Sequence, residues 1–295
     1  MKTNLKLSTR GFSLVEILIG MTITLMIVGA FINLFIKQNQ AYSSESLRQE
    51  MSLNGRIALD EIQREAMNAG TGLPGLFASV QIFDGGPDQP DTVTFIYVPP
   101  SDITLEFATS PKPNASANSM KFSDDSDVAD LVEGDHLIIY DETDFNIIEI
   151  TSLNIPSGTA VFVPPAGVNT PDGLAKAYDP PTTVIARVAL FSLTVDYSDP
   201  ERPELVKFRG SYNQGAVAID IENLQVTIVF ADGDTASAAD DQDADDTNDS
   251  MDLRAVIVKL TARSARPDPR YQVGDQYYRQ EFASTIAPRN VIYGG

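Results

Sequence analysis

Nine aspartates lie between positions 232 and 252, and this run is the densest group of potential ligands in the sequence. Carboxylate oxygens suit Ca²⁺, and a calcium loop takes ligands from positions 1, 3, 5, 9 and 12. If Asp241 is position 1, the set is Asp241, Asp243, Asp245, Asp249 and Asp252. Asp246 stands where such loops have glycine, and the last ligand is Asp instead of the longer Glu. The pattern leaves two interpretations open, a bound Ca²⁺ and a solvated acidic hairpin loop.

His136 is the only histidine, and it follows Asp135 at the start of an apolar segment. A hydrolase triad would also need a nucleophile on a strained turn, and the sequence contains no G-x-S-x-G motif. It has no H-E-x-x-H pair and no P-loop either. We therefore interpret His136 as structural and expect no catalytic site and no enzyme activity.

Residues 70–75 formally match the dinucleotide fingerprint G-x-G-x-x-G. The fingerprint must follow a strand and offer backbone N–H groups to a pyrophosphate. Here the segment follows a predicted helix, and Pro74 lacks an N–H group. We interpret these residues as a helix stop and a turn.

Charge and composition exclude several kinds of partner and site. The formal net charge is −20, which repels polyphosphates, so no nucleic acid partner is expected. The absence of cysteine excludes disulfides, thiolate zinc sites and cysteine nucleophiles. One local group of basic residues could bind an anionic partner: Arg254, Arg263, Arg266, Arg270 and Arg279. The simpler interpretation is that these arginines neutralise the acidic loop or a neighbouring subunit.

The elements that position these residues begin with an apolar segment, residues 12–36, in which Glu16 is the only charge. At about 1.5 Å per residue, this segment is long enough to cross a hydrocarbon layer of roughly 30 Å. Lys2, Lys6 and Arg10 precede it, so the amino terminus is expected in the cytoplasm and the bulk of the chain across the membrane. A secretory signal peptide would have a shorter apolar core.

The junction from Thr9 through Gly11, Phe12 and Ser13 to Glu16 resembles the type IV prepilin motif. The resemblance implies that a prepilin peptidase cleaves between Gly11 and Phe12 and methylates the new Phe12 amine. It also implies that Glu16 pairs with the corresponding amine of a neighbouring subunit. A carboxylate within lipid costs about 2.5 to 3.5 kcal/mol, so a partner is needed. The alternative is a plain signal anchor whose Glu16 reaches the headgroups.

The helix is expected to continue beyond the membrane, because residues 37–68 contain no proline and a single glycine. One set of apolar residues recurs at helical spacing, so one face of the helix is expected to be covered: Leu47, Met51, Ala58, Ile62, Ala66 and Ala69. We predict a cleaved leader at 1–11, a transmembrane half at 12–36, a periplasmic half at 37–69 and a globular domain at 70–295. Gly70, Gly72 and Pro74 end the helix.

The sequence after the helix predicts β structure, so we expect an α+β fold. In this fold the long amino-terminal helix packs on an antiparallel sheet, and a β-rich insertion lies at about 120–163. The predicted strands are short and rich in β-branched or aromatic residues. They cover 92–98, 136–140, 145–151, 159–163, 184–197, 205–208, 224–231, 253–262 and 277–285. The prepilin resemblance implies that this architecture is the pilin fold.

The resemblance extends more loosely to minor pilins of the PilW type through residues 134–139, 221–225 and 287–290. It implies a minor type IV pilin that joins a priming or tip complex at the inner membrane and later the pilus at the cell surface. The expected partners are other minor pilins, the major pilin and the prepilin peptidase. No cofactor is required, with Ca²⁺ as the one candidate. A minor pseudopilin of a type II secretion system and a tip adhesin are the alternatives.

Overall fold

The computed structural model describes residues 13–73, 79–86, 89–99, 104–105, 118–123, 128–141, 145–164, 174, 176–179, 182–210, 212–239, 247–249 and 252–288. The chain divides into two compact units, Met1–Gln49 and Glu50–Gly295. The predicted long helix is confirmed as α1, Leu14–Asn68, and its residues contribute to both units.

The helix ends where the sequence predicts a stop. The Ala69 N–H still donates to the Glu65 carbonyl at 3.1 Å, but Gly70 and Gly72 have φ values of 78° and 73°. Glycine adopts this left-handed backbone without steric cost. The Gly70 N–H then donates to the Ile96 carbonyl at 2.9 Å, so the end of the helix is hydrogen-bonded to the sheet beside it.

Fourteen strands are described, and every printed strand pair among them is antiparallel. The strands are β1 Val80–Phe83, β2 Thr92–Tyr97, β3 Thr104–Leu105, β4 Ser119–Lys121, β5 His136–Tyr140, β6 Phe145–Asn154, β7 Thr159–Val163, β8 Val184–Asp196, β9 Glu204–Arg209, β10 Tyr212–Ile219, β11 Ile221–Phe230, β12 Thr235–Ala236, β13 Leu253–Arg263 and β14 Arg279–Ile286. A short 3₁₀ helix, Ile155–Ser157, joins β6 to β7. The fold class is therefore α+β, as predicted.

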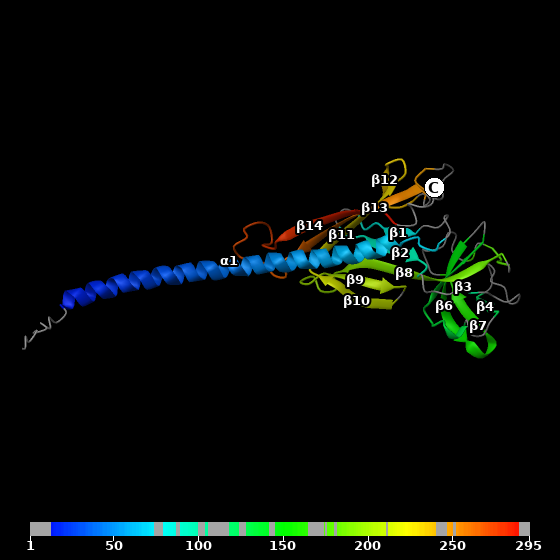
Figure 1. Ribbon diagram of the computed structural model, residues 1–295, viewed down its shortest axis with the longest axis horizontal. Helices are drawn as coiled ribbons and strands as arrows, with labels where there is room; N and C mark the ends of the chain where they lie inside the picture. Colours follow the sequence, from blue (N-terminus) through cyan, green and yellow to red (C-terminus); the bar gives the residue numbers. More distant parts are fainter. Residues whose placement is uncertain are drawn as a thin grey trace, which may run out of the picture. The chain divides into compact units, whose positions relative to one another are not determined.

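Two sheets divide these strands (Figure 1). One is ordered β1-β2-β8-β5-β6-β7-β4, with β3 and β9 also paired to β8 and β10 paired to β9; the other is β12-β11-β13-β14. The 13-residue β8 organises the larger sheet, because its first half pairs with β3 and β5 and its second half with β2 and β9. Strands β3 to β7 thus extend the larger sheet as a β-rich addition built on the first half of β8.

Two buried aspartates join the sheets. The Asp91 carboxylate accepts hydrogen bonds from the Val226 N–H at 2.7 Å and the Gly85 N–H at 3.0 Å. The Asp91 N–H donates to the Leu224 carbonyl at 2.8 Å, so this residue extends the backbone pairing from β2 to β11. Asp220 alone connects β10 to β11 and has a φ of 60°, a left-handed conformation that aspartate tolerates better than most residues.

The strands of the addition are buried on both faces. Leu137 and Ile139 of β5 belong to one apolar cluster with Ile148 of β6, whereas the intervening Ile138 belongs to another with Ile147. Side chains alternate between the two faces of a strand, so both faces of this sheet carry apolar side chains. This double burial explains why β5 reads as a continuous apolar run instead of an alternating one.

Five strands were not predicted from the sequence: β1, β3, β4, β10 and β12. Four of them have two to four residues, too few to show a period. The fifth, β10, contains Asn213, Gln214 and Gly215 and pairs with β9 through two register shifts. These residues have low strand propensity, so the pairing with β9 imposes the extended conformation.

Candidate functional site

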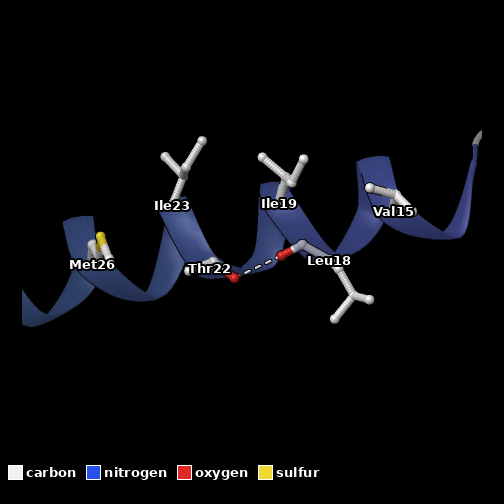
Figure 2. A pocket seen from close by; sticks show the side chains of 6 residues that line it. All are labelled: Val15, Leu18, Ile19, Thr22, Ile23 and Met26. Atoms are coloured by element: carbon white, nitrogen blue, oxygen red, sulfur yellow. Dashed lines mark hydrogen bonds between the residues drawn. The ribbon is translucent and has the colours of Figure 1, made fainter.

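The first half of α1 exposes its apolar side chains. From Leu14 to Ile36 every large apolar side chain is exposed. Figure 2 shows one side of this helix, where Val15, Leu18, Ile19, Thr22, Ile23 and Met26 line a shallow apolar groove. Exposing such a surface to water would be strongly unfavourable, whereas in a bilayer the lipid chains around it are also apolar.

Polar side chains in this half bond within the helix itself. The Thr22 hydroxyl donates to the Leu18 carbonyl at 2.8 Å, as Figure 2 shows, and the Thr24 hydroxyl donates to the Gly20 carbonyl at 2.7 Å. The Asn33 amide donates to the Gly29 carbonyl at 3.1 Å. These polar donors need no water, so they can lie in lipid at low cost. By length and composition α1 can cross a membrane.

Glu16 lies in the first turn of α1. Its Oε2 accepts from the Ser13 N–H at 3.4 Å, and the Glu16 N–H donates to the Ser13 carbonyl at 3.0 Å. Ser-x-x-Glu at a helix start is the capping-box sequence, in which the glutamate binds a backbone donor that the helix leaves free. The carboxylate is thus exposed and held at the start of the helix. Gly11 and Phe12 lie outside the described residues.

The second half of α1, from Glu50 onward, packs into the β domain. Met51, Ala58, Ile62 and Ala66 are buried in one apolar cluster with residues of both sheets. Gly55 faces the Phe282 ring of β14 so closely that a Cβ atom there would overlap the ring. Farther along, the Gln63 amide donates to the Ser284 hydroxyl at 2.7 Å.

A buried charged cluster fixes this half of the helix to β9. The Lys207 ammonium lies 2.8 Å from a Glu61 oxygen and 2.7 Å from a Glu65 oxygen. The same ammonium lies 4.0 Å above the centre of the Phe191 ring. Glu65 and Lys207 are only 3% and 8% exposed, so both charges have left water and depend on each other.

Tyr97 completes this cluster, because its hydroxyl donates to Glu65 at 3.0 Å. Burial and the Glu65 carboxylate raise the pKa of Tyr97 above its usual value, so the phenol remains a donor. This cluster was not predicted from the sequence. Its only local signal is the pair Glu61 and Glu65, four residues apart on α1 and beside the buried Ile62 and Ala66.

The acidic run between β12 and β13 is described only in part. Asp241, Asp243 and Asp245 lie outside the described residues, so the predicted Ca²⁺ site stays a prediction. Of the remaining two residues, the Asp252 N–H donates to the Asp249 carbonyl at 2.9 Å in a turn before β13. Within the described residues, no group of three or more metal-ligating side chains gathers.

Three of the five arginines singled out above, Arg279, Arg270 and Arg263, have described ion pairs with acids of the domain itself. Arg279 Nη2 donates to Glu222 at 2.8 Å and to Asp275 at 2.6 Å. The guanidinium of Arg279 lowers the pKa of Asp275 below its usual value. Arg270 Nη2 likewise donates to Asp268 at 2.8 Å.

Arg263 is buried, and its Nη2 donates to the Pro200 carbonyl at 2.8 Å. Its guanidinium lies 4.6 Å above the centre of the Tyr277 ring. Together with Arg270 and Arg279, it makes its described contacts within the domain, where these residues stabilise loops at one end of the second sheet.

His136 is buried at the start of β5, where Gly210 packs against the imidazole. Its Nε2 lies 3.8 Å from Glu149 Oε2. Burial lowers the pKa of His136 below its usual value, and the Glu149 carboxylate only partly opposes this effect. The imidazole fills a junction between strands, which agrees with the structural interpretation made from the sequence.

Comparisons with known proteins find matches among solved structures. No family model matches the sequence, and no curated protein matches it. Among solved structures, a type IV-like pilin from Thermus thermophilus aligns with a TM-score of 0.37 and 11% identity. The alignment covers 83% of this chain and 98% of that chain.

Proposed function

We propose that this chain is a minor type IV pilin that assembles with other pilins through its helix and carries out no catalysis. One observation carries the proposal: a single helix, Leu14–Asn68, exposes apolar side chains over its first half and is built into a β domain over its second. The motif at Gly11, Phe12 and Glu16 supports it, because that motif resembles the processing site of type IV prepilins.

In this proposal the prepilin peptidase removes residues 1–11, and the apolar half of α1 holds the chain in the inner membrane. The β domain then lies outside the cytoplasm, as the basic residues Lys2, Lys6 and Arg10 predict. Assembly is noncovalent. Glu16, the single charge of the apolar segment, pairs with the Phe12 amine of a neighbouring subunit, while helix faces associate within the bilayer.

The first test asks whether the chain is processed. The intact mass of the protein from membranes should correspond to the chain from Phe12 onward with one added methyl group. Gly11→Val should block this cleavage, because a branched side chain obstructs the extended backbone that a protease needs. A wild-type chain that keeps residues 1–11 would instead support the plain signal anchor.

The second test asks what Glu16 contributes. Glu16→Ala should insert into the membrane normally but enter filaments at least about tenfold less than wild type, because a neighbouring amine would lose its partner in lipid. Glu45→Ala is the matched control, since Glu45 is an exposed carboxylate farther along the same helix. Equal incorporation of all three chains would remove the assembly role of Glu16.

A deletion strain separates the minor pilin from the two alternatives. Loss of pili with secretion intact supports the priming role proposed here. Loss of secretion with pili intact would assign the chain to a type II secretion system as a minor pseudopilin. Normal pili with poor attachment would support a tip adhesin.

A further inference from the structure

The face of α1 that points away from the domain core carries apolar side chains where water should favour polar ones. Leu53 is 58% exposed, Ile57 43% and Met67 38%. With the exposed charges between them they form a row that we name the outer stripe: Leu53, Arg56, Ile57, Asp60, Arg64 and Met67. Positions 53, 57, 60, 64 and 67 alternate spacings of four and three residues, the pattern of a helix that packs against a second helix.

The charges of the outer stripe are positioned for a partner. Within the part of the chain that the structure describes, Arg56 and Asp60 have no ion-pair partner. Arg64 contacts Glu61 and Glu65, yet its side chain remains 62% exposed. The order along the helix is therefore positive, negative, positive, with one helical turn between neighbouring charges.

We propose that the outer stripe binds the outer stripe of a second copy of this chain, with the two helices parallel and displaced by one turn. A displacement of four residues, about 6 Å, brings each position opposite the position four residues later in the second copy. Leu53 then meets Ile57 of the second copy. Arg56 meets its Asp60, and Asp60 meets its Arg64, so this register forms one apolar pair and two pairs of opposite charge.

Other registers of parallel helices match poorly. Without displacement, Arg56, Asp60 and Arg64 would each face their own copies, and like charges repel. A displacement of seven residues would put Asp60 opposite Leu53 and Arg64 opposite Ile57. Each of these charged side chains would then face an apolar side chain instead of an opposite charge. Of these three registers, the one-turn displacement is the one that gives both an apolar pair and two pairs of opposite charge.

The parallel direction rests on the proposed function, in which all copies insert their first halves into the same membrane from the same side. An antiparallel pair could also place Asp60 opposite Arg64. In that pair, however, Arg56 would face the end of the partner helix near Asn68, and Leu53 would not meet Ile57. Position 56 therefore distinguishes the two directions.

Disulfide crosslinking tests the register directly, because the sequence contains no cysteine that could compete. Two full-length chains with different tags, one Leu53→Cys and the other Ile57→Cys, are expressed together and oxidised in membranes. The mixed dimer should form about fivefold more than either homodimer, since only that pair brings the Cβ atoms within disulfide range. Equal amounts of all three dimers, or no dimer at all, would overturn the proposed register.

Charge variants test the same contact without oxidation. Asp60→Arg places like charges at both predicted pairs and should weaken self-association of the full chain in detergent micelles about tenfold. Arg56→Asp should weaken it less, because one pair remains. Mixing the two variants should restore wild-type affinity, since Asp at position 56 then meets Arg at position 60 and native Asp60 meets native Arg64. An antiparallel pair would not be restored by this mixture.

Glu201→Arg serves as the control, because Glu201 is exposed in the turn between β8 and β9 and its reversal changes the net charge equally. An unchanged affinity is expected. If Asp60→Arg associates like wild type, or the mixture fails to recover, the outer stripe is not the contact. Crosslinking in a chain that is never cleaved would count against the proposed function alone. Filament entry without crosslinking would count against the stripe alone.

Discussion

The two halves of α1 share one secondary structure and differ in what surrounds them. From Leu14 to Ile36 the large apolar side chains are exposed and the polar ones bond to their own helix. From Glu50 to Asn68 the helix buries apolar residues in a core built from two sheets and holds two glutamates against Lys207. A helix can thus begin as a segment apolar enough for a membrane and finish as part of a domain core, with no break in its hydrogen bonding.

The glutamates of the two halves of this helix are stabilised in different ways. Glu16 lies at a helix start, where free N–H groups and the helix dipole favour a carboxylate. Glu65 lies in a core, where only a buried cation compensates the loss of water. The same residue type therefore has different stabilising partners in the two halves, and substitutions in the two halves should have different costs.

The largest effect is expected from Lys207→Met. Removing the ammonium leaves the buried Glu65 and the partly buried Glu61 with only the largely exposed Arg64 as a cation, and breaking such a group costs about 3 to 5 kcal/mol. Urea unfolding of the full chain in detergent micelles, followed by tyrosine fluorescence, measures this loss. Adding Glu61→Gln and Glu65→Gln to the same chain should recover much of the stability. A single variant as stable as wild type would show that the cluster does not fix the helix.

A second pair of substitutions compares one glycine from each half. Gly55→Ala forces a methyl group into the Phe282 ring and should destabilise the domain by about 1 to 3 kcal/mol. Gly29→Ala meets open space and should leave the domain unaffected, while it strengthens the helix locally by up to about 1 kcal/mol. The urea midpoints of both variants give the comparison. Equal midpoints would contradict the close contact at Gly55.

The smallest effect concerns pH and tests a site remote from the helix. Burial lowers the pKa of His136, so an unfolded chain binds a proton near pH 6.5 while the folded chain stays neutral to lower pH. The free energy of unfolding should therefore fall as the pH drops below about 6.5. His136→Gln should make this dependence shallower. The unfolding free energies of both proteins at pH 7.5 and 5.5 measure the difference, and identical slopes would exclude this contribution.

Much of the fold follows from local patterns in the sequence. The apolar run after Arg10 and the lack of proline to residue 68 specify a long helix, and Gly70 and Gly72 specify its end. Nine of the strands follow from β-branched and aromatic segments between turn residues. Strand β10 could not be predicted in this way, because Asn213, Gln214 and Gly215 have low strand propensity. Only the pairing with β9 makes these residues extended.

For the candidate sites, the sequence by itself determined a segment able to cross a membrane and its single charge, because lipid responds to composition and length and needs no tertiary contact. Only the tertiary structure decided that Glu61 and Glu65 face Lys207, a residue more than 140 positions away. It also decided that Leu53, Ile57 and Met67 stay exposed. These outcomes depend on which face of the helix the two sheets cover, and that is set by contacts between distant segments.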